Sequence, residues 1–128
     1  MKRLTVSVVT AVLFFVVVLP SLVSADAALE REKQRLTTLK QEIADLVPDL
    51  ATARHKLEIA RDKKRGIERA ARGLRRDDNP DLHDSLKDAE AAMVAAQAKA
   101  DNLRRQLHEK EVEKRQTERR IEVLRRSL

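Results

Sequence analysis

The chain has 128 residues, of which 42% are hydrophobic and 38% are charged, with a formal net charge of +6. It contains two Phe, two Gly and no Trp, Tyr or Cys, which excludes disulfide stapling. A compact core normally draws on aromatic and β-branched side chains, and these become scarce after the N-terminal apolar run, so the composition favours long helices or coiled coil.

Residues 1–25 have the features of an export signal. Lys2 and Arg3 form a basic start, an apolar run covers residues 4–19, and a proline and small residues follow. We expect a signal peptidase to cleave before Asp26. The apolar run is short for a membrane span of about 20 residues, which favours cleavage over a retained anchor. The mature chain is therefore expected in the periplasm or secreted, and at a membrane only if this segment is retained.

The first arm, residues 26–76, carries a coiled-coil register with core positions alternately three and four residues apart. Eleven of its twelve core positions are apolar, and Lys64 is the exception. Pro48 lies on the outer face of the arm, and we expect a kink there because proline removes a backbone hydrogen bond. The core positions are Leu36, Leu39, Ile43, Leu46, Leu50, Ala53, Leu57, Ala60, Lys64, Ile67, Ala71 and Leu74.

The second arm, residues 81–128, carries an equally long register. Eleven of its fourteen core positions are apolar, and the exceptions are Lys110, Lys114 and Thr117. We expect the lysine stems to pack on the seam while the ammonium groups reach water; a hinge or partner site around residues 43–50 and 107–117 is the alternative. The core positions are Leu82, Leu86, Ala89, Met93, Ala96, Ala100, Leu103, Leu107, Lys110, Lys114, Thr117, Ile121, Leu124 and Leu128.

A turn at residues 77–80 separates the two arms. Asn79 suits the N-cap of the second helix and Pro80 suits its first helical position, where a missing N–H costs nothing. Arginines before the turn and aspartates after it complement the two helix dipoles. The stretch therefore predicts a hairpin tip made of Arg75, Arg76, Asp77, Asp78, Asn79, Pro80 and Asp81.

Charge supports an antiparallel pairing of the arms. Residues 51–76 carry ten basic and three acidic side chains, net +7, and residues 77–102 carry two and seven, net −5. Residues 26–50 have a net charge of −2 and residues 103–128 of +4. A hairpin places oppositely charged quarters side by side, and flanking charges select coiled-coil partners in this way. The predicted fold class is all-α: a long two-helix antiparallel coiled-coil hairpin preceded by a signal peptide.

Two surface features are candidates for binding. A basic patch could bind a polyanion, although pairing of its charges with the acidic second arm is favoured; it comprises Arg61, Lys63, Lys64, Arg65, Arg69 and Arg72. Apolar residues off the main register could extend a face for a partner or stand alone on the surface; they are Leu29, Val47, Ile59, Val94, Val112 and Val123. Without aromatic side chains to stack bases, nucleic-acid binding is not expected.

No catalytic, metal-binding or cofactor-binding constellation can be recognised in the sequence. His55, His83 and His108 are not spaced as clustered metal ligands. Ser85 and His83 are two residues apart, so they point to different sides of a helix. We therefore expect no enzymatic activity and no cofactor.

The stretch DLHDSLKDAEAAMVAAQAKADNLRRQL, residues 81–107, resembles the returning helix of the α-hairpin in periplasmic adaptor subunits of tripartite efflux pumps. The resemblance covers about a quarter of the chain, rests on Ala-rich heptads, and implies tip-first docking on an outer-membrane channel. The family's lipoyl and β-barrel segments have no counterpart in this sequence, nor does the serine usual at the start of this helix. The arms are also similar to the helical tentacles of Skp-type periplasmic chaperones, whose β-rich oligomerisation body has no counterpart either.

These features together predict a non-enzymatic, exported coiled-coil hairpin that is a structural or protein-interaction element of the bacterial cell envelope. Its expected partner is an envelope protein or a second copy, in a homo-oligomer or hetero-complex. One alternative is a holdase-like periplasmic chaperone. Another is a membrane-anchored strut, or an adaptor-like hairpin that docks on an envelope channel.

Overall fold

The computed structural model describes residues 25–73 and 79–128, which form two long helices and no strand. Helix α2 covers Ala25–Arg72 and helix α3 covers Pro80–Arg126. The prediction of an all-α, two-helix hairpin is confirmed for these residues. The signal peptide and the tip residues 75–78 lie outside the described residues.

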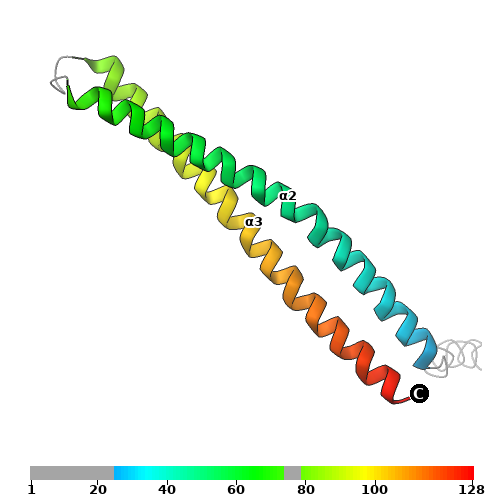
Figure 1. Cartoon of the computed structure of the whole chain (residues 1–128). Helices are drawn as coiled ribbons and strands as arrows, with labels where there is room; N and C mark the ends of the chain where they lie inside the picture. The colour runs from blue at the N-terminus through cyan, green and yellow to red at the C-terminus, as the bar shows by residue number, and fades with distance from the viewer. Residues whose placement is uncertain (1–24, 74–78) are drawn as a thin grey trace, which may run out of the picture. The chain divides into compact units, whose positions relative to one another are not determined.

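The described chain divides into two units. The second unit is Leu39–Glu113, and the described part of the first unit is residues 25–38 with Lys114–Leu128. In the second unit the green part of α2 and the yellow part of α3 lie side by side and run in opposite directions (Figure 1). Each unit thus contains one stretch of each helix.

The core of the second unit is a cluster in which both helices contribute small and large side chains. Ala53, Leu57 and Ala100 are buried in it, and three half-buried residues pack around them: Met93, Ala96 and Leu103. Alanine on one helix leaves room for leucine on the other, which allows the close approach that antiparallel helices need. Folding the second register back onto the first sets Leu57 opposite Ala100, and the cluster confirms this pairing.

The predicted register matches the burial pattern closely. Every described core position of both arms is buried or half-buried except Leu128, which is exposed at the end of α3. Thr117 is the most deeply buried side chain, with 0% of its surface exposed. The interpretation of Leu29 as an off-register surface residue is wrong: it is buried, because it extends the first register one heptad toward the N-terminus.

Lysines in the seam of the second unit are neutralised by nearby glutamates. Lys64, 23% exposed, places Nζ 3.7 Å from Glu68 Oε1 on its own helix and 3.7 Å from Glu90 Oε1 on α3. Lys110 Nζ lies 2.7 Å from Glu42 Oε2. This ion pair balances the negative charge of the buried Glu42 oxygen, although its geometry is not that of a hydrogen bond. The ammonium groups thus lie beside carboxylates at the edge of the seam, where the sequence analysis placed them in water.

Local chemistry explains where α3 begins. The Asn79 side chain accepts a hydrogen bond from the Leu82 backbone N–H at 3.4 Å, the geometry of an N-cap, and Pro80 is the first helical residue. Helix α2 continues through Pro48, which is exposed. A kink at this proline remains a prediction. Within the described residues, neither helix has an apolar stretch long enough to cross a bilayer.

Candidate functional site: three grooves beside the seam

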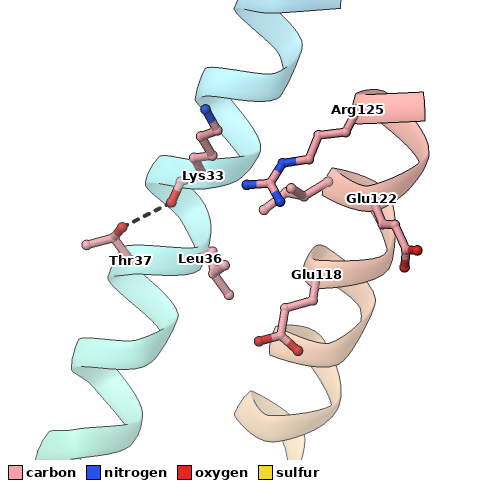
Figure 2. A pocket seen from close by; sticks show the side chains of 7 residues that line it. Lys33, Leu36, Thr37, Glu118, Glu122 and Arg125 are labelled. Atoms are coloured by element: carbon pink, nitrogen blue, oxygen red, sulfur yellow. Dashed lines mark hydrogen bonds between the residues drawn. The ribbon is translucent and has the colours of Figure 1, made fainter. Parts of the chain in front are cut away.

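The first unit carries an open groove between its two helix stretches, called here the Lys33 groove. It has a volume of about 570 Å³, and its lining residues are Lys33, Leu36, Thr37, Glu118, Ile121, Glu122 and Arg125. Figure 2 shows Leu36 and the Arg125 guanidinium reaching into the space between the helices, while Glu122 points away from α2. The groove therefore combines an apolar floor with a rim of both charges.

The cation on the α2 rim of this groove is already engaged. Lys33 Nζ lies 2.8 Å from Glu30 Oε1, and the Thr37 hydroxyl donates to the Lys33 carbonyl at 3.1 Å (Figure 2). Nearby on α2, the Glu32 Oε2 atom is buried with no hydrogen-bond partner among the described residues. A carboxylate oxygen in that position favours a cationic or hydrogen-bond-donating neighbour.

A second groove, the Arg54 groove, lies in the second unit and has a volume of about 250 Å³. The side chains around it are Arg54, Leu57, Glu58, Arg61, Gln97, Ala100, Asp101 and Arg104. The Arg61 guanidinium donates to Gln97 Oε1 at 2.8 Å, and Gln97 Nε2 donates to Asp101 Oδ1 at 3.0 Å. Gln97 thus links a cation on α2 to an anion on α3.

A third groove, the Gly66 groove, lies on the other side of the seam in the second unit. Its volume is about 360 Å³, and its lining residues are Lys63, Gly66, Ile67, Ala70, Leu82, Ser85 and Asp88. Lys63 follows Arg54 by nine residues, or two and a half helical turns, which places the two side chains on opposite sides of α2. Small side chains form the walls, and half-buried Ile67 and Leu82 form the floor.

The predicted basic patch does not form one continuous surface. Arg61 and Lys63 line grooves on opposite sides of the seam, and Lys64 lies in the seam itself. Arg65 Nη1 is 3.9 Å from Asp62 Oδ1 on the same helix, with both side chains largely exposed. Two further members, Arg69 and Arg72, are exposed in the last turn of α2.

The described tip residues act mainly on helix α3. Asn79 caps the helix, Pro80 starts it, and Asp81 places its charge in the first turn, where it complements the helix dipole. Arg75, Arg76, Asp77 and Asp78 lie outside the described residues. Docking through the tip remains a prediction.

The apolar residues placed on the surface from sequence are exposed, apart from Leu29. Val94 is 62% exposed and Ile59 54%, and the others are Val47, Val112 and Val123. Single exposed apolar residues are common, and contiguous apolar patches are the ones that mark interaction sites.

The three histidines are exposed, and the described residues hold no group of three or more His, Cys, Asp or Glu side chains placed to bind a metal. Comparison with protein families, with curated proteins and with solved structures gave no match. The resemblances to efflux adaptors and to Skp-type chaperones therefore remain predictions.

Sequence reasoning missed the grooves and most of the polar residues that line them. Arg54 and Arg104 follow core positions Ala53 and Leu103 directly in the sequence. Only an alignment of the two arms shows that both arginines lie on the same side of the seam. Small residues next to core positions, at Gly66, Ala70 and Ser85, were the available signal for a groove.

Proposed function

We propose that this protein is a non-enzymatic, exported coiled-coil hairpin that acts as a structural or protein-interaction element of the bacterial cell envelope. The proposal rests on the division of the apolar surface of the helices between a buried seam and partly open grooves. One stripe of each helix forms the seam, and grooves with half-buried apolar floors remain beside it. Surfaces of this kind suit the docking of another helix.

Export is the second part of the proposal and rests on the N-terminal sequence. The basic start and the apolar run over residues 4–19 have the form of a cleavable signal. Mass spectrometry of the protein isolated from the envelope fraction tests it. A mature N-terminus at Asp26 supports export with cleavage, a retained Met1 in the membrane fraction supports the anchored strut, and recovery in the cytoplasm contradicts the proposal.

The interaction role is tested by photo-crosslinking in living cells. A photoreactive residue is placed at Val94 or at Leu36, which lies half-buried in the Lys33 groove, and at exposed polar Arg105 as a matched control. We expect one or a few discrete products from the apolar positions and none from the control. A broad smear of unfolded proteins would instead favour the holdase-like chaperone. No product from any position would contradict an interaction role.

A further inference from the structure

Small residues border the seam along the Gly66 groove of the second unit. Gly66, Ala70 and Ser85 are exposed along its walls. A methyl group added at Gly66 would meet nothing within 4 Å. A neighbouring helix could therefore approach the half-buried floor residues Ile67 and Leu82 closely.

The two edges of the groove carry opposite charges. Lys63 lies on the α2 edge and Asp88 on the α3 edge, and both are exposed. No ion pair joins either of them to another residue in the described part of the chain. Each edge therefore offers an uncompensated charge to whatever lies over the groove.

The same side of α3 continues as a weakly polar surface beyond the groove. Ala92 follows Ser85 by seven residues and Ala95 follows Asp88 by seven, so the four positions share one side of the helix. All four are exposed. The solvent-facing side of a coiled coil normally carries charged residues, and 38% of this chain is charged. This side of α3 nevertheless has alanine at positions 92 and 95.

We propose that the Gly66 groove and the adjoining side of α3 form a self-association surface for a second copy of this chain. A two-fold axis along the groove lays the α2 edge of each copy on the α3 edge of the other. Lys63 of one protomer then faces the acidic edge that carries Asp88 of the partner subunit, and the contact repeats symmetrically.

Charge complementarity is the reason for choosing a second copy as the occupant. The two edges of the groove carry one exposed charge of each sign, Lys63 on α2 and Asp88 on α3. A partner of either single sign would meet repulsion on one edge, whereas a copy of this chain supplies both signs in the required order. The inference rests on the proposed interaction role and specifies its partner.

Sedimentation equilibrium of the full chain over a range of protein concentrations tests the inference. We expect a reversible monomer–dimer equilibrium, and Gly66→Leu should raise the dimer Kd by about tenfold or more because it fills the groove. Arg54→Leu is the matched control, since it places the same side chain on the opposite side of the seam. Far-ultraviolet circular dichroism checks that both variants keep their helix content.

Charge reversal gives a second, independent readout. Lys63→Asp and Asp88→Lys should each weaken the dimer, and the double reversal should restore it, because the two edges exchange signs. Arg54→Asp should leave the dimer unchanged. A wild-type chain that stays monomeric, equal effects from groove and control variants, or no rescue by the double reversal would overturn the inference. Discrete envelope crosslinks from a monomeric protein would leave the proposed function standing, so the two failures are distinguishable.

Discussion

The replacement of Leu57 by alanine tests the packing of the second unit in quantitative terms. Leu57 is 6% exposed and lies in the buried cluster with Ala53 and Ala100. Leu57→Ala removes three buried carbons, which at about 0.8 kcal/mol per buried CH₂ gives about 2.4 kcal/mol. The residue also borders the Arg54 groove, so water and side chains can fill the space. We therefore expect a loss of about 2.5 kcal/mol, the low end of the Leu→Ala range.

Urea unfolding followed by circular dichroism measures this loss. Val47→Ala serves as the control, because Val47 lies on the same helix with 52% of its surface exposed, and the change should stay within about 0.5 kcal/mol. Both variants are measured at a concentration where the wild-type chain is monomeric. If Leu57→Ala lowered the free energy of unfolding no more than the control, Leu57 would not pack against α3. The assignment of Leu57 to the seam would then be wrong.

Three further changes probe local features. Lys64→Leu should raise the free energy of unfolding by about 1 kcal/mol, because apolar burial in the seam outweighs two long, partly exposed ion-pair contacts. Urea unfolding measures the change, and a decrease of similar size would contradict this expectation. Asn79→Ala should cost about 1 kcal/mol by loss of the N-cap and should speed amide hydrogen exchange at Leu82, whereas Asn79→Asp should keep both properties. Gly66→Ala should raise the thermal midpoint at a concentration where the chain is monomeric, because it adds up to about 1 kcal/mol of helix propensity where the new methyl has room; a lower midpoint would show that the position is blocked.

The fold could be predicted from sequence because periodicity constrains which side of a helix is buried. Positions alternately three and four residues apart predicted buried Leu57, Ala100 and even polar Thr117. Composition ruled out a compact core, and Asn79 with Pro80 predicted where α3 begins. Each of these is a local property, readable from neighbouring residues.

The grooves could not be predicted because they depend on how the arms align and how closely they approach. Leu36 and Ile121 are both core positions of the registers, yet Leu36 is half-buried and Ile121 is buried, and both line the Lys33 groove. Arg61 and Lys63 were grouped in one basic patch from the sequence. In the helix the two side chains lie on opposite sides of the seam. The register already implies that division, because Arg61 follows core position Ala60 and Lys63 precedes core position Lys64, whereas the size of the grooves depends on how closely the arms approach.

The most direct test of the antiparallel arrangement is a distance between the two helices of one molecule. The chain has no cysteine, so Thr52→Cys and Asn102→Cys, both at exposed positions of the second unit, give unique sites for spin labels. Pulsed electron paramagnetic resonance, with labelled protein diluted in unlabelled protein, should give a separation of about 20 Å, set by helix spacing and label length. A separation near 75 Å, the length of fifty residues in one continuous helix, would contradict the account.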